Sequence, residues 1–236
     1  MQNCLVDKIY DLKPCEILDK LYNNKANGFS LDEIEKKEAE LGYKLPRQLR
    51  NYYENYGKLG INYCLHPIYK IDEIVFSYEL LDDEDIGEEE KNNTQNYLMF
   101  WNENQGVWNA GVLEEDLQKG LDNPKVYMTT EDDLITWEVV SDSLESFLLS
   151  MIIENSEEGF SEMFSAINRP IGDWVIREIK KENVMESIEK YNIDIDKLKS
   201  SYSKHIVTCW DEINKKLFVF FLEEGQFVLL WLYEIA

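Results

Sequence analysis

The fold is decided by residues 29–57, which read Phe-Ser-Leu-Asp-Glu-Ile-Glu-Lys-Lys-Glu-Ala-Glu-Leu-Gly-Tyr-Lys-Leu-Pro-Arg-Gln-Leu-Arg-Asn-Tyr-Tyr-Glu-Asn-Tyr-Gly. Ser30 and Glu33 have the three-residue spacing of a capping box, so a helix is predicted to begin here. Gly42 suits the left-handed residue that follows the end of a helix. Pro46 fits the first position of a second helix. The stretch therefore predicts two short helices joined as a hairpin.

The second predicted helix carries an apolar stripe and ends at Gly57. The stripe consists of Leu49, Tyr52, Tyr53 and Tyr56. Tyr52 and Tyr53 are adjacent on a helix, so their side chains point in different directions. We therefore expect one of these two tyrosines to be partly exposed.

Three later blocks extend this pattern in a fixed order. Residues 100–108 read Phe-Trp-Asn-Glu-Asn-Gln-Gly-Val-Trp, residues 122–127 read Asp-Asn-Pro-Lys-Val-Tyr ahead of Trp137, and residues 143–148 read Ser-Leu-Glu-Ser-Phe-Leu. With the helical hairpin, these blocks resemble the SUKH superfamily over roughly residues 29–150. That superfamily contains the fungal Smi–Knr cell-wall regulators and many bacterial immunity proteins. One departure is Tyr56-Gly57, where many members have Asn-Gly, and we interpret it as a turn variant.

The resemblance implies a protein that binds another protein and is not an enzyme. Bacterial members are thought to neutralise a toxin domain by binding it, often a nuclease or a nucleic-acid deaminase. The fungal relatives imply an alternative, an intracellular scaffold or regulator that binds several partners weakly. An enzyme of another type would need a pocket with converging carboxylates of perturbed pKa, and the spacing of the acids gives no argument for one.

The chain is strongly acidic, with 47 Asp and Glu against 24 Lys and Arg among 236 residues and a net charge of −23. Such a charge disfavours nucleic acids and anionic membranes, because phosphates would be repelled. It favours either a basic protein partner or simply a well-solvated surface. Most of the negative excess lies in residues 1–156, which is the half that carries the resemblance.

The predicted fold class is α+β, in two parts. Residues 1–156 are expected to form the SUKH-like domain, with an N-terminal helix over 4–24 divided near Pro14. Its mixed or antiparallel sheet, flanked by helices, is predicted from residues 97–101, 107–113, 125–129 and 135–140. Residues 157–236 are expected to form a C-terminal α+β module packed on the first domain. This module ends in an antiparallel meander over residues 205–210, 216–222 and 226–233.

Acidic residues of the first domain are the candidate partner-binding site. Residues 82–96 contain almost no apolar side chain, so an exposed loop is predicted there. Three further acids are expected nearby in the fold. A basic partner could be steered onto such a surface by its charge. The predicted contact face consists of Asp82, Asp83, Glu84, Asp85, Glu88, Glu89, Glu90, Glu103, Glu114 and Glu115.

The sequence predicts no catalytic residue, no metal ligand and no cofactor. Its two histidines, His66 and His205, have no Cys, Asp or Glu at the spacing of a metal site. Cys64 lies two residues from His66, but a buried cysteine is favoured over a thiolate pair. Nucleophile-elbow, phosphate-loop and zinc-protease motifs are all missing from the sequence. The oligomeric state stays open.

A cytoplasmic location is expected. The N-terminal residues contain early acids and no apolar run of signal-peptide length. No stretch reaches the roughly 18 apolar residues of a membrane-spanning helix. Cys4, Cys15, Cys64 and Cys209 are scattered along the chain, which fits free thiols in a reducing compartment.

Overall fold

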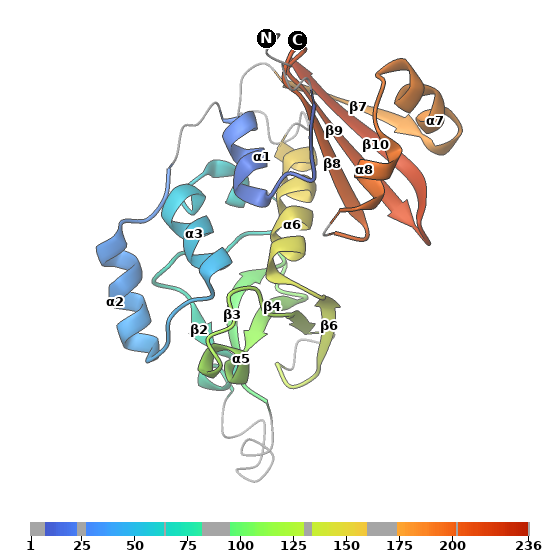
Figure 1. Ribbon diagram of the computed structural model, residues 1–236. Coiled ribbons are helices and arrows are strands. Elements are labelled where there is room, and N and C mark those ends of the chain that lie inside the picture. Colours follow the sequence, from blue (N-terminus) through green and yellow to red (C-terminus); the bar gives the residue numbers. More distant parts are fainter. Residues whose placement is uncertain are drawn as a thin grey trace. The chain divides into compact units, whose positions relative to one another are not determined.

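The computed structural model describes residues 8–22, 27–63, 65–81, 95–129, 134–159, 174–201 and 203–235. The chain forms two compact units: Leu18–Pro170 is one, and Met1–Ile17 together with Ile171–Ala236 is the other. Each unit combines helices with an antiparallel five-stranded sheet, which confirms the α+β fold class (Figure 1). The division into domains at residues 1–156 and 157–236, and the packing of one on the other, stay predictions.

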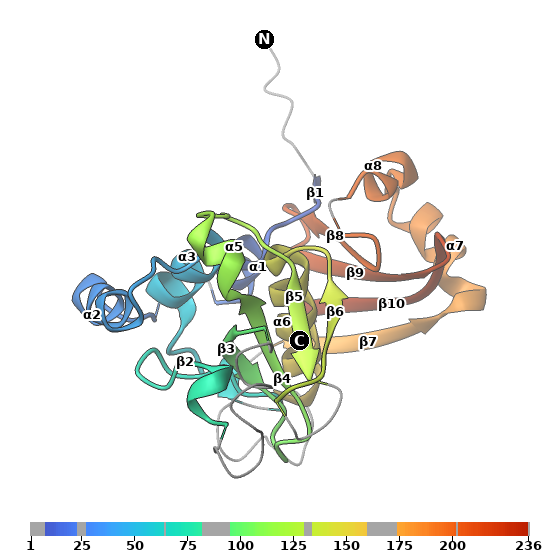
Figure 2. The ribbon, with the colours of Figure 1, turned by 90° about the horizontal axis from the view of Figure 1, so that it is seen from below.

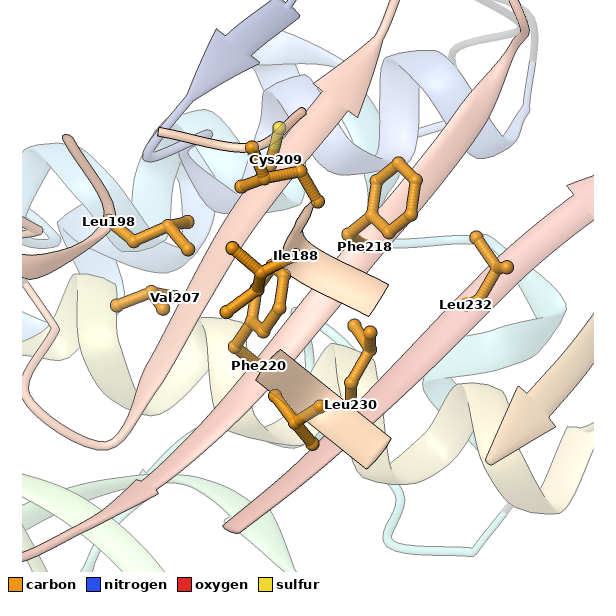
Figure 3. Packing of buried hydrophobic residues seen from close by; sticks show 10 residues of the cluster. Ile188, Leu198, Val207, Cys209, Phe218, Phe220, Leu230 and Leu232 are labelled. Carbon is orange, nitrogen blue, oxygen red and sulfur yellow. The ribbon is translucent and has the colours of Figure 1, made fainter. Parts of the chain in front are cut away.

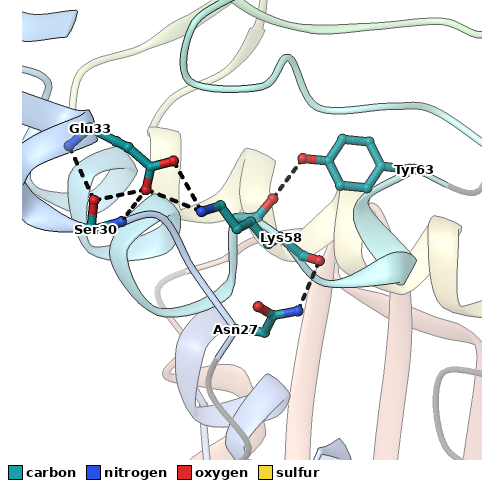
Figure 4. A network of polar contacts seen from close by, with 6 residues as sticks. Asn27, Ser30, Glu33, Lys58 and Tyr63 are labelled. Atoms are coloured by element: carbon teal, nitrogen blue, oxygen red, sulfur yellow. Dashed lines mark hydrogen bonds and ion pairs between the residues drawn. The ribbon is translucent and has the colours of Figure 1, made fainter. Parts of the chain in front are cut away.

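The first helix of the predicted hairpin is α2 (Leu31–Leu41), and its capping box is confirmed. The Glu33 amide donates to Ser30 Oγ at 3.3 Å, and the Ser30 amide donates to Glu33 Oε2 at 2.7 Å. The Glu33 carboxylate also pairs with Lys58 Nζ at 3.1 Å (Figure 4). Gly42 follows the helix with φ 75°, the left-handed conformation that its position predicted.

The second helix is α3 (Arg47–Tyr56), and all four residues of its apolar stripe are buried. It begins one residue later than predicted, because Pro46 is the N-cap with an extended ψ of 139°. The expectation that Tyr52 or Tyr53 is partly exposed is wrong, since both are fully buried. Both hydroxyls have internal acceptors: Tyr52 donates to Asn62 Oδ1, and Tyr53 donates to the Tyr69 carbonyl at 2.7 Å. These hydrogen bonds let both tyrosines be buried without an unsatisfied polar group.

Gly57 at the end of α3 allows Phe29 to approach the helix closely, and it does not adopt a left-handed backbone conformation. Its φ is −58°, which any residue can adopt. A Cβ at this position would lie 2.7 Å from the Phe29 ring and 2.8 Å from the Tyr53 carbonyl oxygen. Phe29 therefore packs against the end of α3 only because residue 57 has no side chain.

The sheet of the unit Leu18–Pro170 is antiparallel throughout, in the order β2-β3-β4-β5-β6 (Figure 2). The four predicted strands are confirmed to within about two residues, and the short strand β2 adds a fifth. The strands are β2 (Val75–Phe76), β3 (Tyr97–Asn102), β4 (Asn109–Leu113), β5 (Val126–Thr129) and β6 (Trp137–Ser141). The unit also contains η1 (Gly60–Tyr63), η2 (Ser77–Glu79), α5 (Glu114–Gln118) and α6 (Leu144–Gly159).

Aromatic side chains from three elements form the centre of this unit. Trp101 of β3 is fully buried and contacts Tyr52 of α3, with ring centroids 6.2 Å apart. Phe147 of α6 packs edge-on against Trp101 at 6.0 Å and against Phe100 at 5.7 Å. Because Trp101 contacts both helices, β3 fixes the positions of α3 and α6 relative to the sheet.

The predicted helix over residues 4–24 is wrong in its first half. Residues Lys8–Tyr10 form a strand, β1, that pairs antiparallel with β8 (Ile206–Asp211). The helix α1 covers only Pro14–Leu21 and begins at the proline, where its missing N–H has no cost. The strand partner lies about 200 residues away in sequence, so no local pattern could have indicated the pairing.

The other unit is built on a sheet of order β1-β8-β9-β10-β7, and its C-terminal meander is confirmed. The additional elements are β9 (Lys216–Glu223), β10 (Gln226–Ile235), β7 (Trp174–Lys180), α7 (Lys181–Lys190) and α8 (Ile195–Lys199). Glu224 and Gly225 join β9 to β10 with φ 48° and 76°, as expected for a two-residue hairpin turn. Residues of both helices, Ile188 and Leu198 among them, cover one face of the sheet over Phe218 and Phe220 (Figure 3).

Candidate partner-binding surface

Seven of the ten predicted contact residues lie outside the described residues. These are Asp82, Asp83, Glu84, Asp85, Glu88, Glu89 and Glu90. The structure places the other three, Glu103, Glu114 and Glu115, on the hairpin β3–β4 and on the helix α5 that follows it. Whether any of the ten contacts a partner stays a prediction.

Glu103 stabilises the turn between β3 and β4. Its Oε2 accepts hydrogen bonds from the amides of Gln105 at 2.6 Å and Val107 at 3.3 Å. Gly106 within this turn has φ 78°. The carboxylate therefore has a structural partner already, and its role in the turn does not require a second protein.

Glu114 lies at the opposite end of the same hairpin. The register pairs Asn102 with Asn109 at the turn and Tyr97 with Leu113 at the other end, so the strands separate Glu103 from Glu114. The structure thus brings together Glu114 and Glu115 on α5 and keeps Glu103 apart from them.

The Glu114 carboxylate joins two other segments. Its Oε1 accepts from the Tyr43 hydroxyl at 2.9 Å, and its Oε2 accepts from Asn96 Nδ2 at 2.9 Å. Glu115 is more exposed and pairs with Lys119 one turn along at 2.9 Å. Glu114 therefore positions the surface, whereas Glu115 has a solvated ion pair that a partner could replace at little cost.

The described residues on either side of the acidic segment 82–90 meet near Glu114. Asn96 Oδ1 accepts from Ser77 Oγ at 3.3 Å and from the Tyr78 amide at 3.4 Å. The same Asn96 side chain donates to Glu114. Ser77, Tyr78 and Asn96 therefore lie beside the α5 end of the hairpin.

A groove of about 510 Å³ runs between α2 and residues 69–80. Apolar side chains, Leu41, Ile74 and Val75, form part of its lining, and Leu80 at 54% exposure adds an apolar residue open to solvent. Its charged lining consists of Lys37, Glu40, Asp72, Glu73 and Glu79. The groove is therefore both apolar and negatively charged.

Three aromatic rings connect this groove with Glu114. The ring of Tyr43 packs on Phe76 at 5.9 Å, and Phe76 stacks on Tyr78 at 6.0 Å. Tyr78 is 42% exposed, and it precedes the groove residues Glu79 and Leu80. The groove, the exposed Tyr78 ring and the α5 acids form one surface. We call it the acidic face, defined by Glu40, Asp72, Glu73, Tyr78, Glu79, Leu80, Glu114 and Glu115.

Burial and nearby carboxylates together raise the pKa of two tyrosine hydroxyls, Tyr63 and Tyr78. Burial, followed by the nearby Glu73 and Asp72 carboxylates, raises the pKa of Tyr63 to about 12. Burial, followed by Glu114 and Glu79, also raises the pKa of Tyr78. Both hydroxyls therefore stay protonated well above neutral pH, and the carboxylates around them would favour a nearby cation.

Sequence reasoning found the α5 acids but missed the groove acids. Ile71 and Ile74 are both buried. Asp72 and Glu73 lie between them, and this alternation of buried and charged residues is the signal that could have indicated an exposed acidic edge. Glu40 joins the groove from α2, and nothing local in the sequence relates it to Asp72.

His66 takes part in contacts that stabilise the fold. The backbone carbonyl of His66 accepts from Trp101 Nε1 at 2.7 Å and from Asn155 Nδ2 at 2.9 Å, and its ring packs on Trp108. In the part of the chain that the structure describes, no three His, Cys, Asp or Glu side chains converge as a metal site would require. Among the same residues, no helix has the length and apolar character needed to cross a membrane.

The family model described as the SMI1 / KNR4 family (SUKH-1) matches residues 28–150. The chain belongs to this family. The matched range of the SUKH-1 protein contains α2, α3, the whole sheet β2–β6 and the beginning of α6. Every residue of the acidic face also lies within it. No curated protein and no solved structure matched the chain.

Proposed function

We propose that this SUKH-1 protein is a bacterial immunity protein that binds and neutralises a basic toxin in the cytoplasm. The toxin would be a nuclease or deaminase domain, as the family resemblance implies. The observation that carries the proposal is the acidic face, which combines six carboxylates with an exposed tyrosine and leucine inside the family-matched unit. Interfaces commonly combine such aromatic and apolar contacts with complementary charge.

The charge of the chain supports this choice of partner. Enzymes that act on nucleic acids carry basic surfaces, because they bind phosphates. A protein of net charge −23 attracts such a surface over several ångströms and accelerates the encounter. Once bound, it would cover the cleft that nucleic acid enters. Inhibition of this kind needs contact and coverage only, so the proposed function is not enzymatic.

The acidic residues 82–90 are proposed to extend the acidic face. The proposal is supported by Tyr78 and Asn96, which lie on either side of this segment in sequence and meet beside Glu114. Replacing the seven acids of this segment with Asn and Gln should weaken binding and flatten its dependence on salt. Unchanged affinity and salt dependence would show that the segment is not part of the contact face.

The proposed function is tested by calorimetric titration against the protein encoded next to this one, at low and moderate salt. Tight one-to-one binding that weakens with salt is expected, together with loss of the toxin's enzymatic activity in the complex. No binding at either salt would contradict the proposal. Weak binding of several unrelated proteins in a partner screen would favour the alternative of an intracellular scaffold, as the fungal relatives imply.

A further inference from the structure

The groove beside α2 has a lining that selects its occupant. Its carboxylates differ in how far they are already paired. Glu40 is within 3.8 Å of Lys36 and 3.6 Å of Lys37, and Glu73 is 3.1 Å from Lys70. Asp72 and Glu79 have no ion-pair partner among the residues that the structure describes. Two carboxylates at the groove are therefore available to a cation from outside.

Among the described residues of the lining, Lys37 is the one cation, and it contacts other lining residues. Lys37 Nζ donates to the backbone carbonyl of Asp72 at 3.2 Å and pairs with Glu40, and its side chain is only 13% exposed. This contact ties α2 to the loop that precedes β2. Lys37 thus neutralises part of Glu40, while Asp72 is attracted to Lys70 without forming an ion pair with it.

We infer that the groove receives one extended segment of the partner, in which a Lys or Arg side chain stands next to an aliphatic side chain. The inference rests on the proposed function and specifies the chemistry of the partner at that same face. The cation pairs with Asp72 and Glu79, and the aliphatic side chain packs against Val75 and Leu80. A volume of about 510 Å³ lies within the range of sites that hold several side-chain-sized groups.

Other occupants fit the lining less well. A phosphate or an acidic peptide would face four carboxylates and a single, already paired, lysine. A purely apolar segment would remove Asp72 and Glu79 from water without giving them a partner, which is costly. A purely cationic segment would leave Leu80, Val75 and Leu41 uncovered. The mixed segment satisfies both kinds of lining residue.

The test uses the full chain labelled with ¹⁵N and three short capped peptides. The first alternates Arg and Leu, the second alternates Arg and Ser, and the third alternates Glu and Leu. Chemical shifts caused by the Arg–Leu peptide are expected to concentrate at residues 37–41 and 72–80. The Arg–Ser peptide should bind roughly fivefold more weakly, and the Glu–Leu peptide should not bind.

Variants identify which groove residues account for this selectivity. The double variant Asp72→Asn, Glu79→Gln should weaken the Arg–Leu peptide roughly fivefold to tenfold, and Leu80→Ser should weaken it by a similar factor. Glu138→Gln is the matched control, since this exposed carboxylate lies on β6 at the opposite edge of the sheet from β2. Equal affinity in the double variant and the control, or shifts centred elsewhere, would overturn the inference.

The toxin complex separates this inference from the proposed function. Full toxin affinity in the groove variants would overturn the groove assignment and leave the immunity function standing. Binding of the Arg–Leu peptide in the groove, with no binding of any toxin, would overturn the immunity function and leave the ligand chemistry of the groove standing.

Discussion

A buried carboxylate organises the turn between α2 and α3. Glu38 is 3% exposed. It accepts from the Leu45 amide at 3.1 Å and from Lys44 Nζ at 2.7 Å, and it forms an ion pair with Arg50 Nε at 3.3 Å. It therefore joins α2 to the connecting loop and to α3. The loop around Gly42 and Pro46 is therefore stabilised by the Glu38 side chain as well as by the backbone conformation of the loop.

Glu38→Ala should destabilise the protein by about 1–3 kcal/mol, because it leaves the buried Leu45 amide without an acceptor. Glu38→Gln should cost less, since its amide oxygen can still accept that hydrogen bond. Chemical denaturation followed by fluorescence measures both values. Glu35→Ala is the control, because Glu35 is exposed and its ion pair with Arg50 is longer, at 3.6 Å. A Glu38→Ala variant as stable as this control would contradict the assigned role.

A second residue-scale prediction concerns acid pH. Hydrogen bonds from the backbone and side chain of Ser30, and then from Lys58, lower the pKa of Glu33 from 4.5 to about 2. The stabilisation from this ionised form is present above pH 4.5 and is lost as the pH falls toward 2. An NMR titration of the Glu33 carboxyl should show this low pKa. Ser30→Ala should move it back toward 4.5, and an unchanged value would contradict the capping arrangement.

At the scale of elements, α3 is closed at its C-terminal end by residues 27–29. The amides of Asn27 and Phe29 donate to the carbonyls of Asn55 at 2.8 Å and Tyr53 at 2.9 Å. These carbonyls belong to the last turn of the helix, where the carbonyls lack amide donors from within the helix, and Tyr53 also accepts from the Gly57 amide at 3.3 Å. The segment thus acts as a backbone cap. Gly28, between its two donors, lies directly against the helix end.

Gly28→Ala should destabilise the protein by about 1–3 kcal/mol through overpacking. A Cβ at residue 28 would collide with the carbonyl of Glu54 and lie 2.6 Å from the Tyr53 oxygen, and neither backbone group can move freely. Thermal unfolding measures the effect. Asn51→Ala, an exposed change on the same helix, should alter the midpoint little. Equal midpoints for the two variants would show that the cap tolerates a side chain.

At the scale of the whole molecule, how much the sequence predicts depends on the distance between interacting residues. The helical hairpin was predictable because Ser30, Gly42 and Pro46 act within one or two turns. The strand β1 was not, since its register with β8 depends on a segment about 200 residues away. The groove was missed for the same reason, because Glu40 and Asp72 meet only in the folded structure. The α5 acids were found because charge is visible residue by residue.

Deleting residues 1–10 should affect the two units unequally. The deletion removes β1, so β8 becomes an edge strand, and its amides should exchange with solvent faster. Amides of β3 and β4, in the unit Leu18–Pro170, should keep their exchange rates and serve as an internal control. Hydrogen exchange followed by mass spectrometry measures both. Equal acceleration in β3, β4 and β8 would show that the units do not unfold separately.

The pairing of Lys8 with Asp211 also orders events during synthesis. The strand β1 leaves the ribosome about 200 residues before its partner β8. Meanwhile the whole segment Leu18–Pro170 has emerged, and its sheet needs no residue from outside that segment. The unit Leu18–Pro170, which bears the acidic face, can therefore fold first on the ribosome. The sheet that contains β1 is completed later, after β8 has emerged.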